Sequence, residues 1–378
     1  MGAKKNTNES LNAALSHRLS RRGFLTTAGL VVAGAALSNA GLNTLTFQKS
    51  NEFSMLENEN ISKDRAMGAF LGAAIGDAMG GPVENMSAEE IKKVYGSIKG
   101  FLPYSKDHIG AGMALHPEPG SITDDTYIRV DITRFYLGTE PPRTPRMLVD
   151  FLLENANFSN WWEPAVNALK RISEGKVSAE EGGMTHEPGG GGAWWTPVGI
   201  VNAGNPLKAA TEIRNLCRPW KGILEQDILA AVHAGTAEAQ REKATCDSVV
   251  NVILDTCSTE AKKLMQRAAE IGYQAKSSDE LIRNLYKHCL VSSILFAEQQ
   301  PLALAAFVFG KGEPERAILQ CVMIGRDCDS TASNVGGWCG GLHGESELPK
   351  AWVETVCQVN RCDFDLRELG EKLLTVKG

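Results

Sequence analysis

Two acidic clusters about two hundred residues apart are the part of the chain best suited to chemistry. They read Thr123-Asp124-Asp125-Thr126 and Asp327-Cys328-Asp329-Ser330-Thr331. Four carboxylates brought together would repel one another, and they could not all stay ionised without compensation. Hard divalent cations such as Mg²⁺ and Mn²⁺ provide it, because they take oxygen ligands from Asp, Thr, Ser and water. The clusters therefore predict a two-metal hydrolytic site.

Each cluster also has a simpler interpretation as the start of a helix. Ser121 and Asp124 have the spacing of a capping box, and acids in a first helical turn interact favourably with the helix dipole. The second cluster follows Gly325 and precedes a stretch of small residues, so it permits the same interpretation. The two interpretations are compatible, because two such helix starts could supply ligands to one shared pair of ions.

A third acidic segment contains two acids seven positions apart, Asp77 and Glu84. Pro82 should end the preceding helix, because proline lacks the N–H that a helix interior requires. Glu84 would then lie beyond the helix end, either facing a cleft or as a solvated loop carboxylate.

The helix before Glu84 has an unusual pattern of glycines. From Asp64 onward, apolar residues recur at three- and four-residue spacing, which predicts a helix. Glycines fall at every fourth position of it, at Gly68, Gly72, Gly76 and Gly80. One face of this helix is therefore bare, and either another backbone or a ligand can approach it closely.

Helical periodicity continues through most of the chain, while strand-like alternation is scarce. We predict an all-α fold, a single globular multi-helix domain over residues 63–378 with a binuclear metal site in a cleft, preceded by a linker over 41–62. Two Gly- and Pro-rich stretches, 96–122 and 181–205, are long enough to form site loops. Helices are expected at 124–138, 145–155, 162–174, 206–217, 225–242, 246–256, 259–273, 278–294, 301–309, 314–324, 330–340 and 349–359.

The N-terminus has the features of an export signal over residues 1–40. A twin-arginine motif stands at Ser20-Arg21-Arg22-Gly23-Phe24-Leu25, followed by an apolar run to Leu37 and a small-residue cleavage site at Ser38-Asn39-Ala40. The run is shorter than the about 20 residues that a transmembrane helix needs. We expect export by the twin-arginine route to a periplasmic or secreted location, with no membrane attachment after cleavage; the alternative is a basic N-terminal helix that is retained.

The net charge of residues 41–378 narrows the class of partner, and the cysteine content bears on disulfides and metal binding. Residues 41–378 carry 34 Lys and Arg against 44 Asp and Glu, which argues against a nucleic-acid partner. The nine cysteines show no zinc-type spacing. One or two disulfides are an option in an oxidising compartment, and buried thiols that behave as small hydrophobes are the alternative.

Taken in order, the motifs resemble the ADP-ribosylglycohydrolase family from about Asp64 to Trp352. The family's Gly-x-x-x-Gly-Asp-x-x-Gly-x-x-x-Glu pattern stands at Gly72 through Glu84, and its Thr-Asp-Asp-Thr motif at 123–126. Its Gly-x-Asp-x-Asp-Thr-x-Ala motif appears at 325–332, with Ser330 in the threonine position and Thr331 one place on. His233 matches a family histidine near the end of a helix, and Leu348-Pro349-x-x-Trp352 matches the closing segment.

The resemblance implies two Mg²⁺ or Mn²⁺ ions and a set of residues around them. The implied metal ligands are Thr123, Asp124, Asp125, Asp327, Asp329 and Ser330, and the implied catalytic residues are Glu84, Asp124 and Asp327. Asp77 is expected to be structural. In such a site the ions orient a ribose and lower the pKa of a bound water, while carboxylates favour an oxocarbenium-like transition state at C1 of the sugar.

The ligand-binding loop departs from the family pattern. Many members carry Gly-Asn-Gly-Ala-Ala-Met-Arg, whereas this chain has four glycines, Gly189 to Gly192, followed by Ala193, Trp194 and Trp195. Backbone N–H groups of Gly190, Gly191 and Gly192 could hold a phosphate. Trp194 could stack on a base or sugar, or pack in the core. His233 could contact substrate, or be a helix residue with its hydrogen bonds satisfied.

The predicted function is metal-dependent hydrolysis of an N-glycosidic bond at C1 of a ribose, by default removing ADP-ribose from a modified acceptor. The substrate would be a small-molecule or protein-linked N-riboside, and the protein would act as a monomer. An exported nucleoside or N-riboside hydrolase of the same fold is one alternative, and a non-catalytic, crystallin-like binding protein is another. A two-metal phosphoesterase is disfavoured, because its usual His-Asp ligand spacing is missing.

Overall fold

The computed structural model describes residues 61–110, 112–184, 191–293 and 295–376. The proposed signal, residues 41–60 of the predicted linker and Gly190 lie outside these ranges. All described residues belong to one compact unit, residues 54–378. Within them the secondary structure is helical, with two isolated β-bridges and no strand, so the all-α prediction is confirmed.

The first half of the described chain contains helices α3 to α10. Their bounds are α3 Lys63–Gly80, α4 Ala88–Tyr95, α5 Asp124–Gly138, α6 Pro145–Asn155, α7 Glu163–Ser173, α8 Thr196–Val201, α9 Pro206–Leu216 and α10 Ile223–Ala239. Short 3₁₀ turns lie between them: η1 Gly81–Val83, η2 Lys106–His108, η3 Phe158–Asn160 and η4 Gly182–Met184.

The second half contains helices α11 to α18. Their bounds are α11 Cys246–Thr256, α12 Thr259–Gln274, α13 Ser278–His288, α14 Phe296–Gly310, α15 Pro314–Ile324, α16 Cys328–His343, α17 Lys350–Val359 and α18 Leu366–Leu373, with 3₁₀ turns η5 Glu345–Glu347 and η6 Asn360–Cys362. None of the described helices is long and apolar enough to cross a lipid bilayer.

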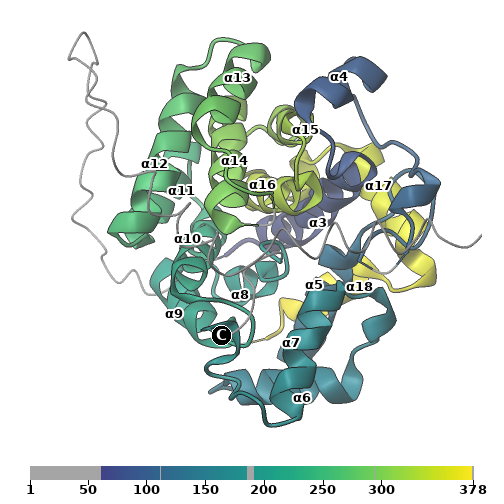
Figure 1. Cartoon of the computed structure of the whole chain (residues 1–378), viewed down its shortest axis with the longest axis vertical. Helices are drawn as coiled ribbons and strands as arrows, with labels where there is room; N and C mark the ends of the chain where they lie inside the picture. The colour runs from purple at the N-terminus through teal and green to yellow at the C-terminus, as the bar shows by residue number, and fades with distance from the viewer. Residues whose placement is uncertain (1–60, 111, 185–190, 294, 377–378) are drawn as a thin grey trace, which may run out of the picture. The chain divides into compact units, whose positions relative to one another are not determined.

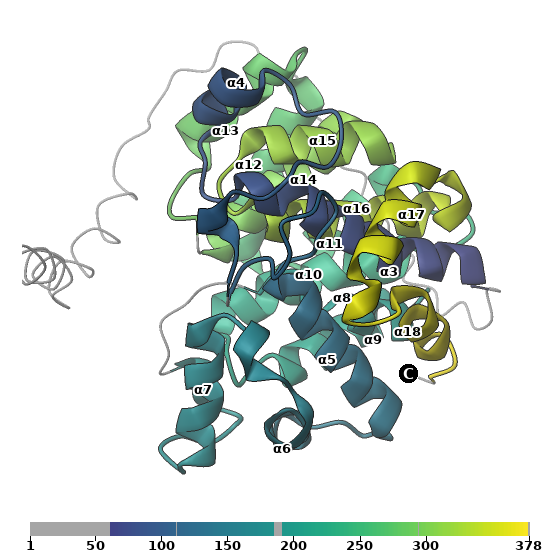
Figure 2. The same ribbon diagram turned by 90° about the vertical axis from the view of Figure 1, so that its right-hand side faces the viewer.

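Helices α3 and α16 form the centre of the unit, and both figures show the other helices arranged around them (Figures 1 and 2). Almost every residue of α3, α14 and α16 is buried. A helix that is apolar or small on all sides can bury its whole surface only when it is surrounded by other elements. Helices α10, α14 and α15 pack against α16, while α17 and α18 pack against α3.

The glycine face of α3 packs against the backbone of α16. A Cβ atom added at Gly72 would lie 2.2 Å from the carbonyl oxygen of Gly336, and one at Gly76 would lie 2.0 Å from that of Ala332. The row continues at Gly68, opposite Gly340. Of the two alternatives for the bare face, the structure therefore has the close approach of another backbone.

Two helical boundaries differ from the expectation by five residues or more. The helix expected over 278–294 ends at His288, because the N–H of Val291 donates to the Glu298 side chain instead of continuing the helix (2.6 Å). The helix expected from Pro301 begins five residues earlier, at Phe296, and encloses the proline. Helices α4, α8 and α18 were not predicted, and α8 occupies part of the expected loop 181–205.

The nine cysteines are all within the described residues and are all free thiols. Five of them are buried, as the interpretation of cysteine as a small core residue predicts.

Candidate active site

The first acidic cluster forms the N-terminus of α5 and is anchored by Asp77 of α3. Thr123 is the N-cap residue, and its hydroxyl accepts from the N–H of Asp125 (3.3 Å). The fully buried Asp77 carboxylate accepts from the Thr123 N–H (3.1 Å), from the Thr123 hydroxyl (2.6 Å) and from the Thr126 N–H (3.1 Å). The carboxylate thus satisfies backbone donors that a helix start leaves free. These contacts agree with the structural role expected for Asp77.

A buried arginine lies behind this helix start. The Arg129 guanidinium donates to the Ala193 carbonyl (3.0 Å), to the Thr126 hydroxyl (3.1 Å) and to the Ser333 hydroxyl. Its positive charge opposes the effect of burial on the Asp77 pKa, which is nevertheless raised because desolvation is the larger effect. Arg129 therefore connects α5 to α16 and to the start of the segment that leads into α8.

The second acidic cluster forms the N-terminus of α16, where Asp327 is the N-cap residue and Asp329 lies in the first turn. The glycine row of α3 ends directly behind it. A Cβ atom at Gly80 would lie 2.3 Å from the Cys328 carbonyl oxygen and 2.5 Å from the Asp329 nitrogen. Backbone packing therefore fixes the position of Asp329.

The two helix starts meet through their hydroxyl groups. The Thr123 hydroxyl, which donates its proton to Asp77, also lies 3.2 Å from a carboxylate oxygen of Asp329, and the Ser330 hydroxyl donates to Asp125 (2.5 Å). Burial raises the pKa of the Cys321 thiol, and Thr331 contacts that thiol and opposes the rise. Of the two neighbouring hydroxyls, Ser330 is therefore the one that faces the acids.

Glu84 joins the second cluster through a pair of tight turns. Asn85 and Arg326 both have left-handed backbone conformations, with φ of 64° and 70°. The Asn85 N–H donates to the Arg326 carbonyl (2.7 Å), and the Arg326 N–H donates to the Met86 carbonyl (2.8 Å). Carboxylate oxygens of Glu84, Asp327 and Asp329 consequently lie within 4.8 Å of one another. Glu84 therefore belongs to the acidic cluster and is not an isolated loop carboxylate.

Burial and mutual repulsion make these acids hard to ionise. Desolvation, then the Asp329 and Asp125 charges, raises the pKa of Glu84 to about 9. Desolvation raises the pKa of Asp125 to about 6, with the nearby Asp77 charge adding to it and the Ser330 hydrogen bond opposing it. The pKa values of Asp124, Asp327 and Asp329 are also raised, first by burial and then by neighbouring carboxylates.

The same groups have the properties of a site for hard cations. All potential ligands are carboxylate or hydroxyl oxygens, the donor type that Mg²⁺ and Mn²⁺ prefer. One of them, Oδ1 of Asp329, is buried and makes no hydrogen bond with any described residue. A buried carboxylate oxygen without a partner is costly, and a divalent cation would satisfy it. The residues present therefore fit the implied metal pair.

Comparisons with known proteins agree with this arrangement. The family model for ADP-ribosylglycohydrolase matches residues 58–378. This chain belongs to the ADP-ribosylglycohydrolase family. Membership of this family supports the interpretation of the protein as a glycohydrolase.

Two curated relatives match along most of the chain. ADP-ribosylarginine hydrolase Tri1 of Serratia proteamaculans is 25% identical over 330 residues, covering 80% of this chain and 78% of the relative. The ADP-ribosyl-[dinitrogen reductase] glycohydrolase of Rhodospirillum rubrum is 23% identical, covering 83% of this chain and 97% of the relative. A solved structure titled "ADP-ribosylglycohydrolase-related protein complex" superposes with a TM-score of 0.61 at 20% identity, covering 84% of this chain and 99% of that one, which shows a shared fold.

The loop that departs from the pattern expected for an ADP-ribosylglycohydrolase contains Gly192, which His233 contacts. The His233 ring is fully buried in α10, and its Nε2 bonds to the Gly192 carbonyl oxygen (3.2 Å). Burial lowers the His233 pKa to about 3, so the ring is neutral and donates from Nε2. These contacts favour the interpretation of His233 as a helix residue that positions the loop.

The two tryptophans of this loop are packed in the core. Trp194 and Trp195 are 1% and 0% exposed, and both rings contact Trp220 (ring centroids 6.2 and 5.9 Å apart). Of the two alternatives for Trp194, the structure favours core packing. Its indole N–H makes no hydrogen bond with any described residue, but it lies close enough to Asp125 to oppose the rise in the pKa of that carboxyl that burial causes. Gly191 has φ of 80°, and a Cβ there would lie 2.4 Å from the Trp194 ring.

Sequence reasoning missed the residues of α14 that support the second cluster. The buried Glu298 carboxylate forms an ion pair with Arg326 (2.7 Å), and the Gln299 amide donates to Ser293 and to Asp327. The run Glu298-Gln299-Gln300, inside an otherwise apolar stretch, was the available signal. Buried polar side chains in such a stretch require partners, which could have pointed to this role.

Proposed function

We propose that this protein hydrolyses the N-glycosidic bond at C1 of a ribose, and that its default substrate is an ADP-ribosylated acceptor. The observation that carries the proposal is the convergence of two acid-bearing helix starts around the unpartnered Oδ1 of Asp329. Curated relatives named for ADP-ribosylarginine and ADP-ribosyl-[dinitrogen reductase] support the choice of ADP-ribose.

Two divalent cations, Mg²⁺ or Mn²⁺, are proposed as the cofactors. Thr123, Asp124, Asp125, Asp327, Asp329 and Ser330 would hold them. When bound, such ions supply Lewis acidity and orient the sugar hydroxyls. The all-oxygen donor set is the reason to propose a hard cation. The assay below decides between Mg²⁺ and Mn²⁺.

In the proposed reaction, a water oxygen adds to C1 of the ribose and the C1–N bond breaks. The water releases one proton to a carboxylate of the acidic cluster, and the leaving nitrogen takes up one proton. Asp124 and Asp327 place negative charge beside the sugar, which stabilises positive charge that develops at C1. Glu84 is the proposed proton donor. It is half-buried, whereas Asp125 and Asp329 are buried, so it is open to proton exchange with the solvent.

The test is chromatographic release of ADP-ribose from ADP-ribosyl-arginine by the full chain, after chelation and readdition of Mg²⁺ or Mn²⁺. We expect release that requires added metal and falls by at least about 100-fold in Asp327→Asn. Asp279→Asn is the matched control, because Asp279 likewise lies at the start of a helix but its side chain is 71% exposed. Metal-independent release, or equal activity of the two variants, would refute the proposed site.

A second candidate substrate is another N-riboside, such as a nucleoside. The replacement of the Asn and Arg of the family loop by Trp194 and Trp195 favours it, because those residues help to hold ADP-ribose in many members. Release of a free base from nucleosides, with no release from ADP-ribosyl-arginine, would establish this alternative.

We also propose that the protein is exported by the twin-arginine route and acts as a monomer. Arg21→Lys with Arg22→Lys keeps the charge but removes the motif, so the full-length precursor should stay in the cytoplasm. Processing of this variant as efficient as that of the natural chain would exclude the route. Light scattering of the purified chain at several concentrations tests the monomer.

A further inference from the structure

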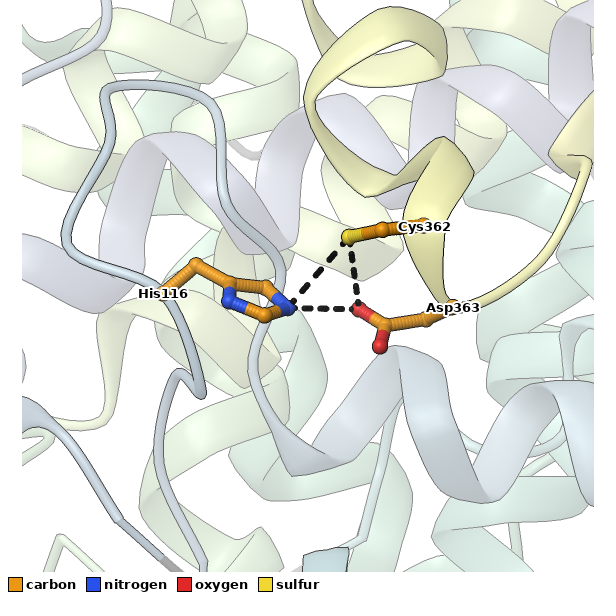
Figure 3. Close-up of side chains that lie close together, drawn as sticks. All are labelled: His116, Cys362 and Asp363. Carbon is orange, nitrogen blue, oxygen red and sulfur yellow. Dashed lines mark hydrogen bonds and ion pairs between the residues drawn. The ribbon is translucent and has the colours of Figure 1, made fainter.

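A second group of metal-ligating side chains lies outside the acidic centre. It consists of His116, Cys362 and Asp363, whose ligand atoms lie within 4.8 Å of one another (Figure 3). His116 is in the loop between α4 and α5, Cys362 ends η6, and Asp363 follows it. The fold therefore brings together residues separated by almost 250 positions.

The three side chains converge on one point. Nε2 of His116 lies 2.8 Å from Oδ2 of Asp363 and 3.6 Å from Sγ of Cys362, and Sγ lies 3.8 Å from Oδ2. A Cys-His-Asp catalytic relay would place the thiol and the carboxylate on opposite ring nitrogens. Here both contact the same nitrogen, so the arrangement is that of ligands around a common centre.

The distances are close to those of a tetrahedral zinc site. With ordinary Zn–S, Zn–N and Zn–O lengths, the S···N and S···O edges of a tetrahedron are about 3.6 Å and the N···O edge is about 3.4 Å. The two edges that involve sulfur agree with the observed 3.6 and 3.8 Å. The His116–Asp363 edge is shorter because these groups share a hydrogen bond, and an ion would replace that bond by opening the edge by about 0.6 Å.

We propose that His116, Cys362 and Asp363 bind one Zn²⁺ ion. A mixed nitrogen, sulfur and oxygen ligand set suits this borderline-soft cation and differs from the all-oxygen set of the acidic centre. The His116 and Asp363 side chains are 33% and 23% exposed, so an ion can enter from solvent and keep a water as its fourth ligand. The buried Tyr127 of α5 donates to Asp363 Oδ2 (2.8 Å) and orients that carboxylate.

The site has a structural consequence for the acidic cluster. Asn360, in the same turn as Cys362, accepts from the Ile122 N–H (3.1 Å) and donates to the Gly120 carbonyl (2.9 Å). A bound ion would add His116 to this attachment and brace the segment that ends at Thr123. Zinc binding should therefore raise the thermal unfolding temperature, since the ligands are assembled only in the folded state.

The test is titration of the full chain with Co²⁺, a spectroscopic substitute for Zn²⁺, in excess Mg²⁺ to occupy the acidic centre. We expect a thiolate-to-cobalt charge-transfer band that saturates at one equivalent and disappears on addition of Zn²⁺. The band should be lost in Cys362→Ser and in His116→Gln, and kept in Cys357→Ser, in which a half-buried thiol five positions earlier in the chain is removed. A band that survives Cys362→Ser would belong to another thiol, such as Cys328 beside the acidic centre, and would overturn the assignment.

A second measurement does not depend on the folding of a cysteine variant. Zn²⁺ should slow alkylation of the exposed Cys362 in the natural chain by about tenfold or more, and should have little effect in His116→Gln. Equal alkylation rates with and without Zn²⁺ would show that the three residues form a hydrogen-bonded tether only. Neither measurement depends on glycohydrolase activity, so this inference can fail or succeed separately from the proposed function.

Discussion

The two acid-bearing helix starts are held in place by different kinds of contact. The start of α5 is anchored by a side chain, because the buried Asp77 carboxylate accepts hydrogen bonds from the backbone and hydroxyl groups of Thr123 and Thr126. The start of α16 is anchored by main chain, because Gly76 and Gly80 of α3 let the α16 backbone lie directly against them. Both anchors belong to the same helix, α3.

The difference between the two anchors predicts that their stability is lowered by different kinds of substitution. A hydrogen-bonded anchor depends on charge and should respond to a change that keeps volume constant. A backbone anchor depends on space and should respond to a single added methyl group, because close-packed main chain cannot rotate away. The first two predictions test these expectations, and the other two concern the acids that the anchors bring together.

The largest effect is expected for Gly76→Ala. The new Cβ would lie 2.0 Å from the Ala332 carbonyl oxygen, so α3 and α16 would have to separate. We expect the free energy of unfolding to fall by about 4 kcal/mol or more, or the chain not to fold. Urea denaturation measures this loss.

Gly337→Ala is the matched control, because a Cβ there would lie no closer than 3.7 Å to a neighbouring atom. Alanine is the better helix former, so this variant should be as stable as the natural chain or more stable. Similar losses for the two variants would show that glycine is needed for a reason other than space.

Asp77→Asn should have the next largest effect. The substitution keeps the shape, removes one acceptor oxygen and takes away one of the two carboxylates, Asp77 and Asp125, whose charges act on the buried Arg129. We expect a loss of about 2–4 kcal/mol of unfolding free energy. Asp64→Asn, in the first turn of the same helix, changes a half-buried carboxylate that accepts from Ser346 and should cost about 1 kcal/mol or less. A loss at Asp77 no greater than at Asp64 would contradict the anchoring role.

The stability of the metal-free protein should fall as pH rises, and added metal should reduce that fall. Folded-state pKa values are raised for Glu84 to about 9 and for Asp125 to about 6, so the folded protein holds protons that the unfolded chain has lost. Without metal, this contribution is complete below the unfolded pKa values and is lost as pH rises through the folded ones. The unfolding temperature in chelator should therefore fall from about pH 5 to about pH 8.

Mg²⁺ or Mn²⁺ should oppose that fall, because cation binding favours the ionised carboxylates. Asp329→Asn should flatten the profile in chelator and reduce the stabilisation by metal. A metal-free protein whose stability rises across this pH range would show that the acids are not repelling one another.

The smallest effect is expected for Ser330→Ala. This variant removes the hydroxyl that donates to Asp125, which should cost about 1 kcal/mol of unfolding free energy and raise the Asp125 pKa further. Ser330→Thr restores the family residue and should retain metal affinity. If Ser330→Ala binds Mn²⁺ as tightly as the natural chain in a calorimetric titration, then the hydroxyl is not a ligand.

Much of this architecture could be predicted from the sequence. The periodicity gave the bounds of α5, α6, α11 and α15 correctly, because their apolar faces and capping residues are local signals. The glycine spacing indicated that another backbone or a ligand lies close to α3. The composition of the two acidic clusters indicated that they lie together in the fold. Each of these patterns is contained in a short stretch of chain.

The remaining features depend on contacts between distant residues. The reciprocal bonds between Asn85 and Arg326 and the bond from Gln299 to Asp327 join segments that no local pattern relates. The end of α13 at His288 depends on Glu298, which competes for a backbone donor. Trp194 could not be assigned to core or ligand until Trp220 was known to pack against it.

The glycine contacts of α3 also limit how the site can change over evolutionary time. Gly68, Gly72 and Gly76 lie opposite Gly340, Gly336 and Ala332, so the two helices mesh with a four-residue period. Sliding α16 by less than one turn, about 5.4 Å, would push carbonyl groups into the facing backbone. The two halves of the acidic centre can therefore shift relative to each other only in steps of about one helical turn. New substrates can be accommodated by exchanging side chains such as Glu84 or Ser330, but not by gradual movement of the helix that carries Asp327 and Asp329.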